Sequence, residues 1–151
     1  MKAAAAILVL LALCAPAALA QAPAAAAAPV TLDFEYFRTK VEPILLRKRP
    51  EHARCYACHS QGTPLVIERM SPGATTWNDE QSHKNFDIIR RVVVPGNPMR
   101  SRLLLMPLAH EAGGIEFHPG GKHFLSQSDP EFRELVEWVN GAKAPSAGAA
   151  R

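Results

Sequence analysis

Apolar residues recur with a helical period in three stretches of this chain. The first stretch, residues 33–49, has apolar positions at Phe34, Phe37, Val41 and Leu45. Their spacing is close to the 3.6-residue period of an α-helix. Pro43 lies inside the stretch and predicts a kink or a break near Glu42, because proline lacks the amide hydrogen and crowds the preceding turn. Pro50 is expected to end the helix.

The second stretch is predicted to begin near Asn78 or Asp79, where Gln81 is placed for a capping box. Its buried stripe is expected to consist of Phe86, Ile89 and Val93. The pair Pro95-Gly96 should stop it. Ser101 can then cap a short helical turn over residues 102–106.

The third stretch has the clearest boundaries. Asp129 is a suitable N-cap, Pro130 suits the first helical position, and Gly141 can end the helix. Phe132, Leu135, Val136 and Val139 share one face. Trp138 lies beside that face and is predicted to be a core aromatic residue.

The intervening segments, residues 60–77 and 107–128, carry Gly, Pro and His and are predicted to be loops. The pattern therefore indicates one small all-α domain over residues 31–141. Residues 21–30 are rich in Ala and Pro and are predicted to be a disordered leader. Residues 142–151 are predicted to be a flexible tail.

The N-terminal end has the pattern of a secretory signal peptide. A short basic start, an apolar run and the small residues Ala18-Leu19-Ala20 precede a predicted cleavage point, so residues 1–20 would be removed. We therefore expect an exported, periplasmic protein that has also lost Cys14. The alternative is an uncleaved membrane anchor, although the apolar length is borderline for a bilayer span and Pro16 interrupts it.

The net charge of +3 falls to +2 without Lys2. This charge is too small to indicate nucleic-acid binding. Five basic residues nevertheless cluster before residue 55: Lys40, Arg47, Lys48, Arg49 and Arg54. We interpret them as a solvated helix face. The alternative is a docking patch for an acidic redox partner, since surface charge steers encounter.

The most specific motif is Cys55-Tyr56-Ala57-Cys58-His59, which reads C-x-x-C-H. This is the attachment pattern of a covalent c-type haem. The two thiols can form thioethers to the two vinyl groups of the porphyrin, and the adjacent imidazole of His59 can bind the iron as the proximal ligand. The motif predicts one covalently attached haem c.

Three other kinds of site also use a pair of cysteines. A thioredoxin-like redox site expects a βαβ context, which the pattern lacks. A zinc site usually takes four ligands from paired motifs, and the mature chain has no second cysteine pair. A disulfide between Cys55 and Cys58 is compatible with an oxidising compartment.

The second iron ligand is predicted to come from a loop that folds over the other face of the haem. The candidates after the motif are Met70, His83, Met99, Met106, His110, His118 and His123. We prefer His118, because the paired glycines Gly120 and Gly121 that follow it allow close approach to a flat ligand. Met106 is the alternative, and a thioether ligand would raise the reduction potential. His123 and His110 rank below these two.

The chain resembles class I-like cytochrome c domains, and in particular the planctomycete-type cytochrome c domain. The resemblance spans about residues 33–141. It is carried by V-E-P-I-L before C-Y-A-C-H-S, by V-P-G-N-P-M-R-S-R-L-L, by F-H-P-G-G-K-H-F and by D-P-E-F-R-E-L-V-E-W-V-N-G. It implies a cytochrome c-like fold, with N- and C-terminal helices around a covalent haem and long loops. It also implies an exported monohaem protein with Cys55, Cys58 and His59 as its haem residues.

The expected function is electron transfer by a haem iron that cycles between its ferric and ferrous states, without enzymatic activity of its own. The expected partners are redox proteins. One alternative is a haem subunit of a periplasmic oxidoreductase. Another is an open-site haem protein that reacts with peroxide or binds a gas. Glu111 and Glu116 lie near the ligand loop, but surface carboxylates are the default.

Overall fold

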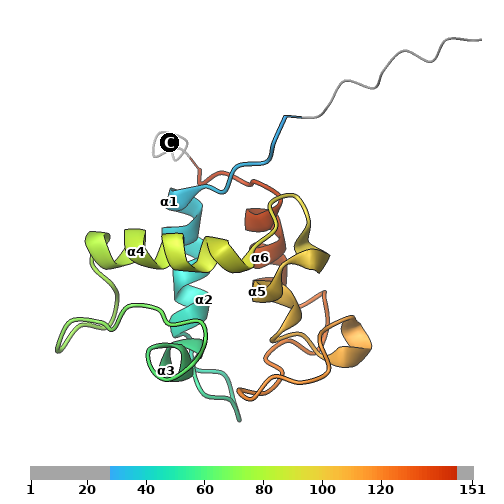
Figure 1. Ribbon diagram of the computed structural model, residues 1–151, viewed down its shortest axis with the longest axis horizontal. Helices are drawn as coiled ribbons and strands as arrows, with labels where there is room; N and C mark the ends of the chain where they lie inside the picture. The colour runs from blue at the N-terminus through green and yellow to red at the C-terminus, as the bar shows by residue number, and fades with distance from the viewer. Residues whose placement is uncertain (1–27, 146–151) are drawn as a thin grey trace, which may run out of the picture.

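The computed structural model of the chain describes residues 28–145 (Figure 1). Within that range the protein is mostly helical and has no strand; an isolated bridge joins Leu108 to Phe124. The α-helices are α1 (Phe34–Tyr36), α2 (Glu42–Leu46), α3 (Cys55–His59), α4 (Asp79–Ile89), α5 (Arg102–Leu105) and α6 (Pro130–Val139). The remaining helical turns are η1 (Phe37–Val41), η2 (Arg90–Val92), η3 (Pro98–Arg100) and η4 (His110–Ala112). The predicted all-α class is confirmed.

The first helical run is continuous from α1 through η1 to α2. Of the two predicted outcomes near Glu42, a kink or a break, the break does not occur: η1 is a π-helical turn in which the amide of Glu42 donates to the carbonyl of Phe37. The wider turn accommodates Pro43, which has no amide hydrogen and whose ring crowds the carbonyls before it. The run ends at Leu46, before Pro50, because the backbone becomes extended at Arg47.

The caps of α4 and α6 agree with the predictions. The side chain of Asn78 accepts from the amide of Gln81, and the side chain of Gln81 accepts from the amide of Asn78, which completes the capping box. Asp129 accepts from the amides of two residues in the first turn of α6. Ser101 precedes α5 as predicted but does not cap it, because its hydroxyl bonds to the backbone of Val94.

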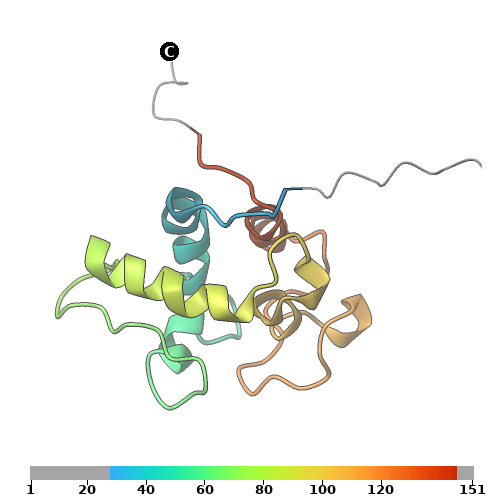
Figure 2. The same cartoon turned by 45° about the horizontal axis from the view of Figure 1, so that its top comes forward.

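The first helical run and α6 pack side by side at the centre of the molecule (Figures 1 and 2). Trp138 of α6 is fully buried, with its ring 5.3 Å from that of Phe37. Its indole N–H donates to the carbonyl of Asp33 at 2.8 Å. The predicted core role of Trp138 is confirmed, and this residue ties the two ends of the domain together.

The contacts of the domain continue past Gly141. Ala142 and Ala144 pack against the core, and Lys143 pairs with Asp33 at 3.6 Å. The predicted signal peptide with Cys14, most of the leader and residues 146–151 lie outside the described residues. Between residues 28 and 145, no helix has the length and apolarity that a bilayer span requires.

Three residues of the basic cluster pair with acidic residues of α6 and its cap. Arg49 donates to the carboxylates of Asp129 and Glu131 and lies 4.5 Å from the centre of the Phe124 ring. Arg47 and Lys40 also form ion pairs to α6, at 2.7 and 3.6 Å. The interpretation as a solvated helix face is therefore wrong for Arg49, which is partly buried because it joins the chain after α2 to the start of α6.

Candidate functional site

The five residues of the C-x-x-C-H motif form the short helix α3. Because residues three and four apart lie on one side of a helix, Cys58 and His59 share a side with Cys55. Cys58 is exposed, Cys55 is half-buried, and both are free thiols. Burial raises the pKa of Cys55 to about 11. Its sulfur is therefore protonated at neutral pH.

The imidazole of His59 is oriented by the loop that follows α3. Its Nδ1 lies 2.9 Å from the carbonyl oxygen of Leu65 and 3.2 Å from the hydroxyl of Thr63. A neutral imidazole that donates its N–H from Nδ1 keeps a free lone pair on Nε2. Histidines that bind metals usually have their other nitrogen held in this way.

His118 is held by the same kind of contact. Its Nδ1 lies 2.7 Å from the carbonyl oxygen of Gly121, and the amide of Gly121 donates back to the carbonyl of His118 at 2.9 Å. The ring folds over this turn, because a Cβ atom on Gly120 would lie 3.2 Å from the ring carbon Cε1. Gly120 therefore leaves room for the His118 ring, which is a different role from the close approach to a flat ligand that the sequence suggested for the paired glycines.

The structure brings His59 and His118 together from distant parts of the chain. Their ring centroids lie 6.2 Å apart, with the ring planes inclined by 15°. Two imidazoles that bind one metal ion from opposite sides, with metal–nitrogen bonds of about 2 Å, have centroids roughly 6 Å apart. The centroid spacing of His59 and His118 therefore matches that of two histidines bound to one metal ion, and α3 also carries two free thiols.

The loop that carries His118 is attached at several points. Lys122 donates to the carbonyls of Met106 and Ile115. His123 is buried, with its ring 6.5 Å from that of His118 and 4.8 Å from that of His52. Burial, with the neighbouring His52 and His118, lowers the pKa of His123 to about 4. His123 is therefore neutral at pH 7.

The other predicted ligand candidates have different surroundings. The sulfur of Met106 accepts from Arg102 at 3.8 Å. His83 stacks on Phe34 with ring centroids 3.8 Å apart. Met99, His110, Glu111 and Glu116 are exposed, and Met70 packs against the core. Among residues 28–145, no three His, Cys, Asp or Glu side chains gather closely enough to hold a metal ion together.

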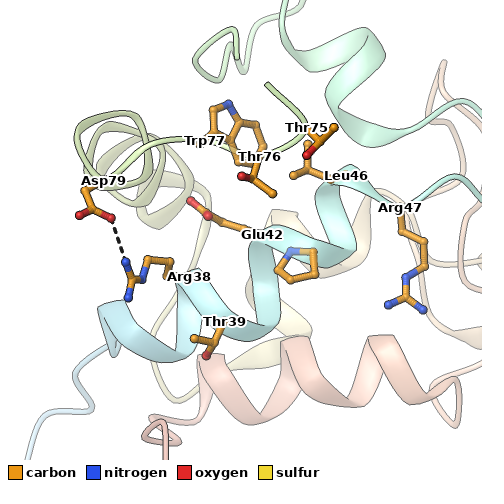
Figure 3. Close-up of a pocket in the computed structure, with 10 residues that line it drawn as sticks. Arg38, Thr39, Glu42, Leu46, Arg47, Thr75, Thr76, Trp77 and Asp79 are labelled. Carbon is orange, nitrogen blue, oxygen red and sulfur yellow. Dashed lines mark hydrogen bonds and ion pairs between the residues drawn. The ribbon is translucent and has the colours of Figure 1, made fainter. Parts of the chain in front are cut away.

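Sequence reasoning missed a second polar cluster, at the edge of a hollow of about 490 Å³ beside α2 (Figure 3). Glu42 lies there under Trp77 and is only 6% exposed. One of its carboxylate oxygens accepts from Ser82 at 3.1 Å, while the other is buried without a partner. Burial raises the pKa of Glu42 to about 7.

The backbone groups that orient the two histidines were also missed. The carbonyls of Leu65 and Gly121 carry no side-chain identity, so no residue type in the sequence could reveal them. Thr63 offered a hydroxyl close to the motif, and that is the signal through which the arrangement at His59 could have been found.

The chain matches no family model, no curated protein and no solved structure. Its interpretation therefore rests on the residues themselves. Those residues are the two thiols of α3 and the two oriented imidazoles at 6.2 Å.

Proposed function

We propose that this protein is an exported monohaem c-type cytochrome that transfers electrons. The observation that carries the proposal is the pairing of His59 with His118 at a centroid distance of 6.2 Å. His59 belongs to a C-x-x-C-H motif, and this motif specifies covalent haem attachment. The resemblance to the planctomycete-type cytochrome c domain supports the same function.

Each residue of the site has a defined role in the proposal. Cys55 and Cys58 form the thioethers, His59 is the proximal ligand and His118 is the distal ligand. The carbonyls of Leu65 and Gly121 accept hydrogen bonds from the Nδ1–H groups, which fixes both rings and makes them more basic ligands. Bound haem supplies a one-electron couple between ferric and ferrous iron.

The fold supports this function because the helical frame is separate from the ligand-bearing segments. The first helical run and α6 form a packed core around Trp138. The ligand-bearing segments, α3 and the His118 loop, lie beyond the ends of that core (Figure 2). In the proposed cytochrome c-like fold, these segments would enclose the haem beside the helix pair.

Two histidine ligands leave no open coordination position for a substrate. We therefore assign the role of electron carrier rather than enzyme. Electrons would be exchanged with other redox proteins. Export belongs to the same proposal, on the basis of the signal peptide predicted over residues 1–20.

The optical spectrum of the full chain, exported from a host with cytochrome c maturation machinery, tests the proposal. We expect a low-spin c-type spectrum in both oxidation states, without the weak ferric band of a methionine–iron bond. A high-spin spectrum would instead indicate an open iron site and favour a peroxidase-like or gas-binding protein. A protein without covalent haem would contradict the proposed function.

A further inference from the structure

The hydroxyl of Thr63 takes part in a three-way contact with His59. Its oxygen lies 3.2 Å from Nδ1 of His59 and 2.6 Å from the carbonyl oxygen of Leu65. The same carbonyl oxygen lies 2.9 Å from Nδ1 of His59. The ring nitrogen, the hydroxyl and the carbonyl therefore form a closed triangle of polar atoms.

The loop that carries this triangle is short and closed at its base. The amide of Ile67 donates to the carbonyl of His59 at 2.7 Å, which encloses residues 60–66. Gly62, inside the loop, has a left-handed backbone with φ of 64°. Arg69 donates to the carbonyl of Ser60 at 3.2 Å. Thr63 therefore sits in a loop whose two sides are already joined.

The donors and acceptors of the triangle can be assigned when Nε2 of His59 binds iron. Nδ1 then carries the hydrogen and donates to the carbonyl of Leu65, with the oxygen of Thr63 as a second, longer acceptor. The hydroxyl of Thr63 donates its own hydrogen to the same carbonyl. A carbonyl oxygen has two lone pairs, so it can accept a hydrogen bond from each of these groups.

We propose that Thr63 is a positioning residue that sets the reduction potential of the haem through His59. This inference rests on the proposed function. The hydroxyl fixes the carbonyl of Leu65 against Nδ1 and adds its own oxygen as an acceptor. Both effects strengthen the hydrogen bonding of the Nδ1–H group and thereby make the imidazole a stronger electron donor to the iron.

The sign of the effect follows from the charge on the iron. A more basic imidazole favours ferric over ferrous iron, because the ferric ion carries the extra positive charge. Loss of the Thr63 hydroxyl weakens the hydrogen bonding of the His59 Nδ1–H group and makes the imidazole less basic, so the reduction potential should rise. Hydrogen bonding to an iron-bound histidine is one of the means by which a protein tunes the potential of a haem.

The test compares Thr63→Val with Thr63→Ser in the exported full-length protein. Valine keeps the shape of the side chain and removes the hydroxyl, whereas serine keeps the hydroxyl. Thr39→Val is the matched control, because Thr39 also donates to a backbone carbonyl, that of Glu35 at 2.7 Å, away from the site. The midpoint potential and the solvent exchange of the His59 Nδ1 proton in the reduced protein are measured.

We expect Thr63→Val to raise the midpoint potential and to speed the exchange of the Nδ1 proton. Thr63→Ser and Thr39→Val should match the wild-type protein. Thr63→Ala removes the same hydroxyl and replaces Thr63→Val if valine prevents folding.

An unchanged potential and exchange rate in the hydroxyl-free variant would overturn the role of Thr63 and leave the proposed function intact. An equal shift in Thr63→Ser would overturn it as well, because the hydroxyl would then be irrelevant. A wild-type protein without covalent haem would overturn the proposed function and this inference together.

Discussion

Two polar clusters lie within this small domain, and they differ in how their atoms are paired. At the first, each of the imidazoles of His59 and His118 has one nitrogen bonded to a backbone carbonyl. At the second, one carboxylate oxygen of Glu42 is buried without a partner. The first cluster is half-exposed, whereas Glu42 is only 6% exposed.

This difference separates a site prepared for a ligand from a site that costs stability. When one nitrogen of an imidazole is held by a hydrogen bond, the other nitrogen points in a defined direction and no polar atom of the ring has to give up a partner. A buried polar atom without a partner costs about 1–3 kcal/mol, because it has lost its hydrogen bonds to water. Changes at the histidine pair should therefore alter the spectrum and potential of the proposed haem, and changes at Glu42 should alter the pH dependence of stability.

The largest effect should come from removing both thiols beside the histidine pair. We expect Cys55→Ala with Cys58→Ala to abolish covalent haem, because no thioether can form. Haem staining after denaturing electrophoresis measures this directly. Cys14→Ser is the matched control, since Cys14 lies in the predicted signal peptide. Haem that stays attached in the double variant would rule out the interpretation of the motif.

The next largest effect should come from His118. We expect His118→Ala to keep the haem attached, because both thioethers and His59 remain, but to shift the potential and to let carbon monoxide bind the iron. Optical spectra with and without carbon monoxide measure this change.

Met106→Ala and His123→Ala serve as the comparison variants for His118. Each should keep the wild-type spectrum. If Met106→Ala alone opens the iron, Met106 is the distal ligand and the pairing of the two imidazoles has another purpose.

The smallest effect should come from the second cluster. The pKa of Glu42 rises from 4.5 to about 7 on folding, so the folded state holds a proton that the unfolded state releases. Stability should then fall as the pH rises from about 4.5 to about 7 and level off above that. A shift of this size corresponds to at most about 3 kcal/mol.

Glu42→Gln should flatten this part of the pH profile, because the amide has no charge to bury. Denaturant unfolding between pH 4 and pH 8, at steps of roughly one unit, measures the change, and Glu116→Gln provides an exposed control. A profile for Glu42→Gln that still falls across this range would show that another group carries the dependence.

The sequence predicted the elements whose ends are marked by side chains. The capping box of Asn78 and Gln81 and the N-cap at Asp129 located α4 and α6, because a capping side chain bonds within its own first turn. Pro43 indicated a disturbance of the first helical run, but not that a π turn would accommodate the proline and keep the run continuous. The burial of Glu42 depends on Trp77 and Ser82, which come from a different part of the chain.

The candidate site was predictable to the same extent. The C-x-x-C-H motif is local and named its residues directly, and the paired glycines pointed to His118. The backbone carbonyls that orient the rings have no residue signature, so the sequence could not reveal them. The pairing of Arg49 with Asp129 and Glu131 likewise required the fold, because these residues are distant in the chain.

The contacts of Asp33 have a practical consequence for how the molecule can be attached to a surface or a label. Asp33 accepts from the indole of Trp138, pairs with Lys143 and accepts from the amide of Ala144. The beginning and the end of the domain therefore leave it at one corner, and α3 lies at the opposite side (Figure 1). An electrode linker, a fluorescent label or a lipid anchor attached at either end would thus hold the histidine pair facing outward.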